Sequence, residues 1–490
     1  MRNFHLPGRS GVFTSTAMAA TSHPIASKVA LDLLSKGGNA MDAAIGAAVV
    51  QGIAEPQMTG IGGDAFVLYT PAGSQQVKAL NGSGRAPAGF GPAGMGAQGH
   101  TSIPIFHNAA AVTIPGAVDA FCKLNAEVGR LPLSDVLAPA IHYAEAGIPV
   151  APRVASDWAN AVGNLHESAG SRYLINGAAP RIGQNFACPD QAKALRLIAE
   201  NGRAGFYEGA VAQDMVDTLQ TLGGVHTLDD FESVTSTTNA PITSTYGAFD
   251  VYEHPPNGQG IIAQLLLNIL KNFDLSKLDP FGIERTHIEA EAAKLAYDTR
   301  DRFLADQTPK IDHILSQGTA DALANLIDPK RALDLSTGLT GAVHKDTICL
   351  TVVDKDRMVV SLIYSIFKTF GSGIAADKYG ILLHNRGAGF NLTKGHLNEA
   401  TPGKRPMHTI IPAIAAERGQ ITLPFCVMGG QYQAIGHARF LTNISDFGMD
   451  LHSAIDGPRS FPQFGKLELG DGSSAHVKAV AEVQTKIVVA

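Results

Sequence analysis

The sequence predicts a globular chain of the α/β (α+β) class, in which a long helix-rich part precedes a short strand-rich part. Apolar residues make up 45% of the 490 residues and charged residues 17%, which is typical of chains that build a packed core. Helical periodicity dominates the first part, and short apolar runs separated by turns dominate from Thr347 onward. The boundary between the two parts falls near residue 340.

The helix-rich part is predicted to open with two helices within residues 21–54. Apolar side chains recur there at the helical period, the Gly37–Gly38 pair interrupts the run, and Asn39 is a suitable cap for the second helix. Residues 116–220 are mainly helical by the same criterion. Strands are predicted for the end of MTGIGGDAFVLYT, for VKALNGSG, and for the start of GAFDVYEHPPNGQG, which ends in a Pro/Gly turn. Helices are predicted for IIAQLLLNILKNF and THIEAEAAKLAYDTRDRFLAD.

The strand-rich part consists of short apolar segments with turns between them. A helix is predicted again within residues 432–454, and no internal repeat is visible. The predicted strands are ICLTVVD, MVVSLIYSIF, YGILLH, TIIPAIAAE and LPFCVMGG.

Charge and hydropathy argue against a nucleic-acid or membrane partner. The formal net charge is −6 and no run of Lys and Arg is present, whereas nucleic-acid binders carry basic stripes. The best apolar stretch, Ala43–Ala54, is shorter than the roughly 18 residues of a membrane span. The N-terminus has no clean apolar segment of the signal-peptide kind, so a cytoplasmic location is expected. The four cysteines, which fit no metal or redox spacing, are expected to be reduced core residues: Cys122, Cys188, Cys349 and Cys426.

Common catalytic motifs are absent from the sequence. There is no HExxH, no paired Cys-x-x-Cys, no GxxxxGK[ST] phosphate loop and no GxSxG elbow. The GIGGD segment at residues 60–64 does not fit a dinucleotide fingerprint. No metal site and no cofactor are therefore expected.

The Asp346–Thr347 junction suggests a different chemistry. A threonine hydroxyl needs a base, and a cut before Thr347 would supply its own α-amine, whose ordinary pKa is about 8. The turn at residues 354–357 predicts a hairpin in which Ser365 lies near Thr347, and Gly429–Gly430 follow an apolar strand where N–H groups can hold an oxyanion. The alternative is an ordinary half-buried hairpin whose threonines suit strands.

A set of ordered motifs resembles the γ-glutamyltransferase (γ-glutamyltranspeptidase) family over nearly the whole chain. The resemblance implies an N-terminal nucleophile hydrolase with a four-layer αββα sandwich fold, made as a precursor that cuts itself. The motifs in the first part are SHPIASKVALDLLSKGGNAMDAAIGAA, MTGIGGDAF, TIPGAVDAF, HPPNGQG and HIEAEAAKLAYDTRDRFLAD. Those in the second part are DTICLTVVDKD, FGSGI, GILLHNRGAGF, PGKRPMHTIIP, VMGGQ and NISDFGMD…AIDGPR.

The resemblance assigns roles to particular residues. Cleavage at Asp346–Thr347 would give a large subunit, 1–346, and a small subunit, 347–490, with Thr347 as the nucleophile at its N-terminus. These subunits could further pair as a dimer. Ser365 matches the hydroxyl that supports the nucleophile, Thr351 matches a hydroxyl position on the first strand, and Gly429 and Gly430 match the oxyanion glycines.

The donor pocket departs from the family pattern. The family Arg that holds the α-carboxylate is Ser83 here, with Arg85 two residues later. A family Asn is replaced by Phe367, and the Asp that holds the α-amine by Gly389. A Ser-Ser pair becomes His408–Thr409. A substrate ammonium therefore loses its predicted partner, a loss that costs roughly 1.5–3 kcal/mol when the contact is buried.

Two cations remain near the predicted pocket. Arg85 and Arg386 could each bind a substrate carboxylate in a fork, or could form a structural salt bridge instead. His408 could bind substrate or support its loop. The family's final strand pair is expected to be incomplete, since the chain ends soon after Arg459.

Three hypotheses follow. The leading one is a self-cleaving amide hydrolase that acts on a small, anionic acyl amide through an acyl-enzyme on Thr347. This is the chemistry of the divergent branch of the family, which includes cephalosporin acylases and an oxamate amidohydrolase. The second is a glutathione hydrolase or γ-glutamyltransferase that moves γ-glutamyl to water, amino acids or peptides. The third is an uncut scaffold without catalysis.

Overall fold

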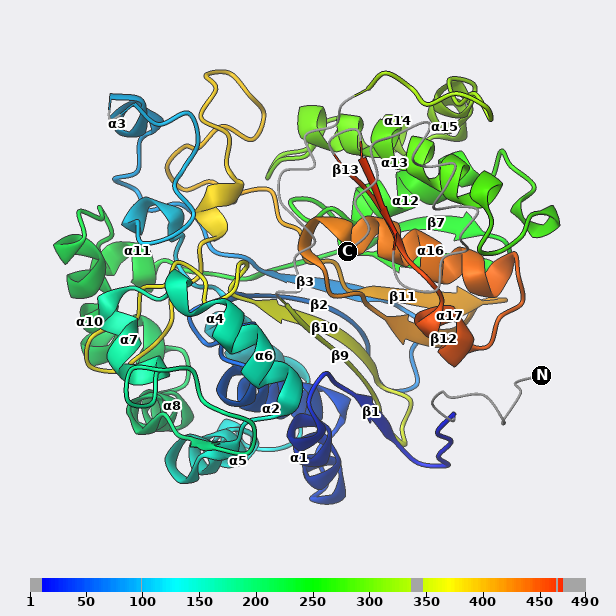
Figure 1. Cartoon of the computed structure of the whole chain (residues 1–490). Coiled ribbons are helices and arrows are strands. Elements are labelled where there is room, and N and C mark those ends of the chain that lie inside the picture. Colours follow the sequence, from blue (N-terminus) through cyan, green and yellow to red (C-terminus); the bar gives the residue numbers. More distant parts are fainter. Residues whose placement is uncertain (1–10, 98, 336–346, 464–465, 470–490) are drawn as a thin grey trace.

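Two antiparallel sheets lie face to face, and helices cover the outer face of each sheet (Figure 1). The computed structural model describes residues 11–97, 99–335, 347–463 and 466–469. In Figure 1 the helices α1, α2, α5 and α8 lie on one side of the stacked sheets, and α12, α13 and α16 lie on the other. The predicted four-layer αββα sandwich is therefore confirmed.

The larger sheet contains strands from both parts of the chain. Its order is β1-β9-β10-β2-β3-β6, so the hairpin β9–β10 of the strand-rich part lies between strands of the helix-rich part. The two parts of the chain thus share one sheet. Its strands are β1 (Met18–Ala20), β9 (Ile348–Val353), β10 (Val359–Ser365), β2 (Asp64–Thr70), β3 (Lys78–Gly82) and β6 (Thr237–Asn239).

The turn of the β9–β10 hairpin is held by one carboxylate. Oδ1 of Asp354 accepts hydrogen bonds from the backbone N–H groups of Asp356 and Met358, both at 2.9 Å. Oδ2 accepts a third from Ala40 N at 2.9 Å, at the first residue of α2 (Ala40–Ala54). Asp354 therefore fixes the hairpin and attaches it to the helix beneath the sheet.

Helix α2 is buried along its whole length, which its small side chains make possible. Asn39 caps the helix as predicted and forms a capping box with Asp42. A Cβ at Gly46 would lie 2.3 Å from Cδ1 of Leu33, so the glycine allows α1 (Pro24–Ser35) to pack closely. The main apolar core lies between these helices and the larger sheet.

The smaller sheet has the order β12-β11-β8-β7 and packs against a second apolar core formed with α12, α13 and α16. Its strands are β12 (Gln420–Phe425), β11 (Ala413–Glu417), β8 (Phe249–Glu253) and β7 (Ile242–Tyr246). The strand pairs β4 (Ile148–Pro149)–β5 (Asn185–Phe186) and β13 (Ser460–Gln463)–β14 (Lys466–Leu469) form two further, two-stranded sheets.

The remaining helices cover the two outer faces and the ends of the sandwich. Those of the first part are α3 (Pro92–Ala97), α4 (Ala117–Val128), α5 (Leu133–Ala146), α6 (Pro152–Asn160), α7 (Glu167–Tyr173), α8 (Pro189–Asn201), α9 (Ala204–Tyr207), α10 (Gly209–Thr221), α11 (Leu228–Glu232), α12 (Gly260–Leu270), α13 (Ile283–Phe303), α14 (Ile311–Ile314) and α15 (Gln317–Ala324). Those of the second part are α16 (Gln433–Ser445) and α17 (Leu451–Asp456). Short 3-10 turns are η1 (Ala109–Ala111), η2 (Val162–Asn164), η3 (Leu275–Lys277), η4 (Arg386–Gly389) and η5 (Gly430–Tyr432).

Two predictions about the second part were wrong. The segment YGILLH forms no strand, because Leu382 and Leu383 make single bridges to different partners, Ala375 and Gly62. Cys349 and Cys426 are not reduced: they form a disulfide between β9 and the end of β12, with Cα atoms 6.1 Å apart. The other two cysteines, Cys122 and Cys188, are free thiols, and for these two the prediction is confirmed.

A strand pair, β13–β14, does follow Arg459, and residues 470–490 lie outside the described residues. Among the helices that the structure describes, none combines the length and the apolar character needed to cross a bilayer.

Candidate active site

Thr347 and Ser365 lie side by side at the same end of the β9–β10 hairpin. The register pairs Ile348 with Tyr364, so Thr347, directly before β9, lies opposite Ser365, the last residue of β10. Thr347 Oγ1 is 3.2 Å from Ser365 Oγ, within hydrogen-bond distance. Both residues are buried. The structure therefore brings together the two hydroxyls that the sequence predicted to be neighbours.

The backbone turns sharply after Ser365. Ser365 Oγ accepts a hydrogen bond of 2.9 Å from the N–H of Phe367, which has a positive φ of 77°. This conformation is unusual for a non-glycine residue and takes Phe367 off the strand. The predicted strand MVVSLIYSIF therefore ends two residues early, at Ser365, and Phe367 does not share a strand face with Ser365. Ser365 Oγ accepts this bond with one lone pair, and its hydroxyl can still either donate to Thr347 Oγ1 or accept from it.

Gly429 and Gly430 form the turn between β12 and α16. Their φ values, 138° and 53°, lie in the region that favours glycine. The turn is held by the Gln259 side chain, whose Nε2 donates to the carbonyls of Gly430 at 2.9 Å and Thr409 at 2.8 Å. The hydroxyl of Tyr297 in α13 donates to the carbonyl of the next residue, Gln431.

Arg386 connects this turn to the hydroxyl pair. Its Nη1 donates to Thr409 Oγ1 at 3.0 Å, and its guanidinium carbon lies 4.1 Å from the ring centre of Phe367, a cation–π distance. Its exposed fraction is only 1%. Nε and Nη2 have no hydrogen-bond partner among the described residues. A buried guanidinium with two free donors is prepared to bind an anion.

A buried carboxylate, Asp64, lies on the strand next to Ser365. The β2–β10 register pairs these two residues directly. Oδ1 of Asp64 accepts hydrogen bonds from the N–H groups of Gly84 and Gly116 at 3.0 and 3.2 Å. Oδ2 accepts a hydrogen bond of 3.2 Å from Nε2 of His408 and lies 3.5 Å from Nδ1 of His384. One carboxylate thus joins four loops around the hydroxyl pair.

The electrostatics of this cluster favour an ionised Asp64 and neutral histidines. Burial opposes ionisation of Asp64, but His384, the hydrogen bond from His408, and Arg386 together lower its pKa to about 2. Burial and the nearby Arg386 lower the pKa of His408 to about 3. Burial lowers the pKa of Arg386 to about 9, against the attraction of Asp64, so it stays charged at neutral pH. Asp64 and Arg386 are therefore the fixed charges of the cluster.

Gly389 and Ser83, which stand at the positions of the family Asp and Arg, both lie in close contact with neighbouring backbone or side chains. A Cβ at Gly389 would lie 2.9 Å from the carbonyl of Met407, so an aspartate does not fit there without a backbone shift. Ser83 is buried, and its hydroxyl accepts a hydrogen bond of 3.2 Å from the amide Nδ2 of Asn257. Its carbonyl accepts from Nε of Arg405 at 2.8 Å.

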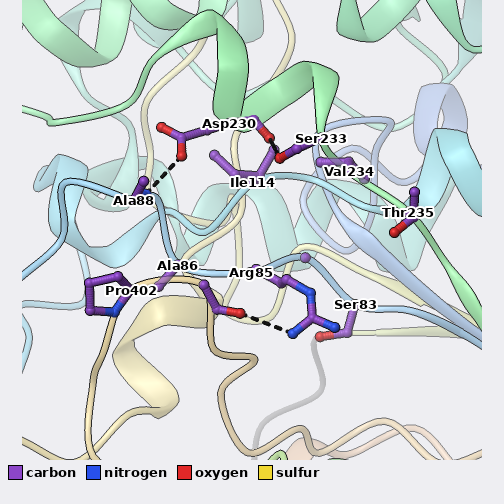
Figure 2. Close-up of a pocket in the computed structure, with 12 residues that line it drawn as sticks. Ser83, Arg85, Ala86, Ala88, Ile114, Asp230, Ser233, Val234, Thr235 and Pro402 are labelled. Atoms are coloured by element: carbon purple, nitrogen blue, oxygen red, sulfur yellow. Dashed lines mark hydrogen bonds between the residues drawn. The ribbon is translucent and has the colours of Figure 1, made fainter.

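Two of the predicted substrate-binding residues are not part of this chain of contacts. Thr351 pairs with Ser361 and is four residues, roughly 13 Å, along β9 from Thr347. Arg85 binds elsewhere: its Nη1 lies 2.9 Å from the carbonyl of Gly403 and 3.3 Å from Oδ2 of Asp306. It lines a cavity of about 300 Å³ together with Ser83 and Gly84, shown in Figure 2 beside Ala86 and Pro402.

Asp64, His384 and Gln259 were not predicted from the sequence. A signal for Asp64 was present, because it is the one charged residue in the run GIGGDAFVLY, which becomes a fully buried strand. Gln259 carried no signal that separates it from an ordinary helix-cap residue. His408 was left open between two roles, and its hydrogen bond to Asp64 together with its full burial shows that it supports the cluster. Asp346 lies outside the described residues.

A metal ion has no evident place in the described part of the chain. No group of three or more His, Cys, Asp or Glu side chains is arranged there to hold one.

Comparison with known proteins agrees with this geometry. The curated glutathione hydrolase-like YwrD proenzyme of Bacillus subtilis is 36% identical over 461 residues, covering 91% of this chain and 85% of the relative. The oxamate amidohydrolase proenzyme of Klebsiella pneumoniae is 32% identical over 449 residues, covering 90% of this chain and 84% of the relative.

Solved structures give the same result. A cephalosporin acylase from Bacillus halodurans superimposes with a TM-score of 0.92 at 34% identity, covering 100% of this chain and 92% of the acylase. The family model described as gamma-glutamyltranspeptidase matches residues 26–485. The chain belongs to the gamma-glutamyltranspeptidase family, whose members are enzymes acting on amide bonds.

Proposed function

We propose that the chain cuts itself between Asp346 and Thr347 and then works as an amide hydrolase with Thr347 as its N-terminal nucleophile. The products of the cut would be the subunits 1–346 and 347–490. The observation that carries the proposal is the 3.2 Å contact between the hydroxyls of Thr347 and Ser365 at the end of the hairpin. The relatives' names add support, because both curated relatives described above are called proenzymes.

The proposed reaction uses four groups of the chain. The free α-amine of Thr347 takes the proton of Oγ1, which attacks the substrate carbonyl carbon. The N–H groups of Gly429 and Gly430 stabilise the oxyanion that forms. The amide C–N bond breaks, the leaving amine takes the proton, and the acyl group stays on Oγ1. Water then hydrolyses this ester, and the Ser365 hydroxyl donates a hydrogen bond to Oγ1 throughout.

The acyl group that fits best carries a carboxylate and no ammonium. Arg386 offers two free, buried donors, a geometry that suits a carboxylate. The position of the family's amine-binding Asp is Gly389, where a side chain has no room. A zwitterionic head would therefore lose its ammonium partner and pay a desolvation cost of several kcal/mol. The name oxamate amidohydrolase points the same way, because oxamate is an amide with a carboxylate and no amine.

A comparison of two chromogenic amides tests the proposal. Glutaryl-p-nitroanilide has the carboxylate of a γ-glutamyl group without its α-amine, so we expect it to be hydrolysed faster than γ-glutamyl-p-nitroanilide. Arg386→Ala should lower kcat/KM for the glutaryl compound at least tenfold, about 1.4 kcal/mol. Butyryl-p-nitroanilide, which has no charge, should be unaffected, and Arg85→Ala serves as the matched arginine control.

Three results would decide against parts of this proposal. A tenfold preference for the γ-glutamyl compound would support the glutathione hydrolase alternative, which the similarity to the glutathione hydrolase-like relative also favours. Loss of activity in Arg85→Ala but not in Arg386→Ala would place the anion site in the cavity of Figure 2. A single uncut chain without turnover would support the third hypothesis, an uncut scaffold without catalysis. The cytoplasmic location and a dimer of subunit pairs stay predictions.

A further inference from the structure

The disulfide between Cys349 and Cys426 lies between the proposed nucleophile and the proposed oxyanion turn. Cys349 is two residues beyond Thr347 on β9, and Cys426 is three residues before Gly429. Strand positions alternate, so Cys349 and Thr347 point to the same side of the sheet. The bond therefore links the two backbone segments that carry the chemistry.

The two linked strands belong to different sheets. β9 lies inside the larger sheet, whereas β12 is an edge strand of the smaller one. Beside the disulfide, Ser361 Oγ in the neighbouring strand β10 donates to the backbone carbonyl of Phe425 at the end of β12 at 3.0 Å. The two cysteines pack against a small apolar cluster of Phe66, Ile363 and Ile410. A covalent bond at this place sets the spacing of the two sheets where the active site needs it.

The hydrogen bonds that hold the glycine turn lie on its far side. Gln259 and Tyr297 bind the carbonyls of Gly430 and Gln431. Both carbonyls come after the proposed oxyanion N–H groups of Gly429 and Gly430 along the chain. Before the turn, Met428 is 41% exposed, and Cys426 is held by the disulfide. The disulfide thus complements the hydrogen bonds, and together they restrain the turn from both ends.

We propose that the Cys349–Cys426 disulfide is a redox-sensitive latch that holds the oxyanion turn in its active position. Its effect on turnover rests on the function proposed above, whereas its existence does not. In the reduction step, a thiolate of a small dithiol attacks one Sγ and breaks the Sγ–Sγ bond. The second thiol of the dithiol then resolves the mixed disulfide. Two cysteine thiols and one cyclic disulfide result, with two electrons transferred.

Cys349 and Cys426 are each only partly buried, so we expect a small dithiol to reach the bond between them. The other two cysteines provide a clean background. Burial raises the pKa of Cys122 and of Cys188 to about 12, so neither thiol forms much thiolate in the folded protein. Added reductant should therefore act at the latch, and the count of free thiols should report its state.

The existence of the bond is tested without any activity assay. Protein purified without reductant is denatured, alkylated and weighed by mass spectrometry. We expect two alkylated cysteines before reduction and four afterwards, with a Cys349–Cys426 peptide pair in the non-reduced digest. Four alkylated cysteines at the outset, still four after treatment with oxidised glutathione, would overturn the inference.

The effect of the bond is tested by kinetics on the matured enzyme. Removing one oxyanion donor outright costs about 100- to 1,000-fold in kcat, so a loosened turn should cost less, about three- to thirtyfold. We expect this loss of kcat, with KM within about twofold, on adding dithiothreitol. Cys349→Ala and Cys426→Ala should show the lower kcat from the start and no response to reductant. Cys122→Ala should respond as wild type does.

The two proposals fail in different ways. If the oxidised and reduced forms turn over equally fast, the latch is refuted and the amide hydrolase stands. If no amide is hydrolysed, the thiol count still decides whether the bond exists, and the melting temperature of oxidised against reduced protein decides whether it restrains the fold. An unchanged melting temperature there would refute the latch.

Discussion

In the proposed mechanism the hydroxyl of Thr347 is needed first for the cut and then, once the cut has freed its own amine, for turnover, so two single substitutions separate chemistry from folding. Thr347→Ala should abolish both the cut and turnover. Thr347→Ser should keep part of each, because a hydroxyl and an amine remain. Intact mass and a denaturing gel follow the cut. A fragment beginning Thr-Ile-Cys-Leu is expected from wild type, and active protein that remains one chain would contradict the mechanism.

Ser365 is expected to assist both steps without being needed for the fold. Its hydroxyl, 3.2 Å from Thr347 Oγ1, stabilises the developing charge on that oxygen. Ser365→Ala should slow the cut and turnover by about 100-fold, the lower end of the range for loss of such a group. Ser365→Thr keeps the hydroxyl and should retain more activity. A melting temperature equal to that of wild type would show that the loss is chemical.

Because of its buried histidines, we expect acid to destabilise the protein at pH values well above those at which carboxylates titrate. Burial lowers the pKa of His408 to about 3 and that of His254 to about 4, against 6.5 in the unfolded chain. As the pH falls below 6.5, the unfolded state binds protons that the folded state does not, so the free energy of unfolding falls. Each histidine contributes up to about 1.4 kcal/mol per pH unit.

A histidine substitution checks this account. In His408→Gln, the side-chain amide can still donate to Asp64, but it does not titrate. Urea unfolding between pH 6.5 and 4.5 should then show a slope smaller by about one proton. Below pH 3.8 the loss of the ionised Asp64, whose pKa is about 2 in the folded state, adds to the decline in both proteins. An unchanged slope above pH 4.5 would mean that His408 titrates normally.

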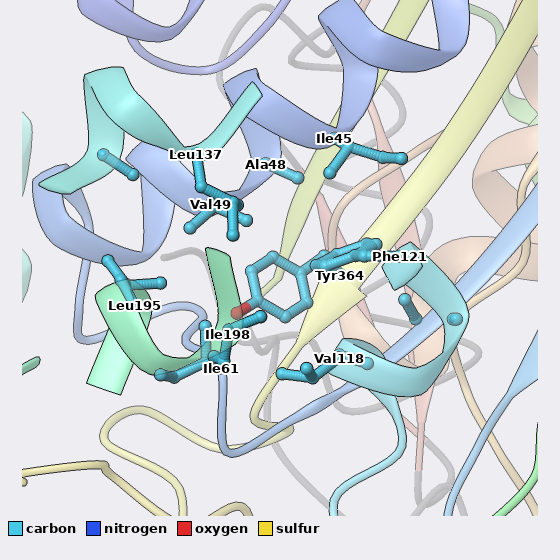
Figure 3. Close-up of a cluster of buried hydrophobic side chains, with 14 of the residues drawn as sticks. Ile45, Ala48, Val49, Ile61, Val118, Phe121, Leu137, Leu195, Ile198 and Tyr364 are labelled. Atoms are coloured by element: carbon cyan, nitrogen blue, oxygen red, sulfur yellow. The ribbon is translucent and has the colours of Figure 1, made fainter. Parts of the chain in front are cut away.

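At the scale of elements, the strand that carries Ser365 is held by one large side chain. Figure 3 shows the ring of Tyr364 in β10 among apolar side chains that include Ile45, Val49 and Phe121. The Phe121 ring packs edge-on, with centroids 5.2 Å apart. Tyr364 and Ser365 are consecutive in β10 and point to opposite faces of the sheet. The Tyr364 ring, packed on the helix side, therefore positions the Ser365 hydroxyl on the opposite face.

Truncating this anchor should damage stability and the site together. Tyr364→Ala should lower the free energy of unfolding by about 3–5 kcal/mol, as for other large aromatic truncations, and should slow the cut. Tyr364→Phe keeps the packing and should stay close to wild type in both. Urea denaturation and the fraction cut after a fixed time are the measurements. Wild-type cutting in the alanine variant would show that the strand end is held by other contacts.

Element positions followed from the sequence where periodicity was long, and failed where a single contact decides. Helices α1 and α2 and the β9–β10 hairpin were expected from apolar spacing and turn residues. The end of β10 was not, because Phe367 continues the alternation while a hydrogen bond to Ser365 turns the chain away. The disulfide was not, because its cysteines are 77 residues apart and no local spacing connects them. Asp64 was overlooked because its partners come from distant loops.

At the scale of the whole molecule, the strand order predicts that the two subunits stay together after the cut. β9 pairs with β1 on one side, and β10 pairs with β2 on the other. Residues 347–490 therefore supply the middle of a sheet whose flanks belong to residues 1–346. Separating the subunits would expose strand edges and the main apolar core, at a cost comparable to unfolding.

Size-exclusion chromatography and a denaturing gel on the same sample check this expectation. The matured protein should elute no later than the uncut Thr347→Ala variant, although the gel shows two bands. Separate peaks for the two chains under native conditions would show that the shared sheet does not hold them.

Because strands of the two proposed subunits alternate in one sheet, refolding after the cut would differ from folding before it. The precursor folds as one chain, so β9 and β10 reach their places at a rate independent of concentration. Once the chain is cut, recovery from unfolding requires two molecules to meet and one to insert its hairpin between strands of the other. Mature protein at low concentration would then persist through its slow unfolding rate rather than through a reversible equilibrium. Maturation would convert thermodynamic stability into kinetic stability.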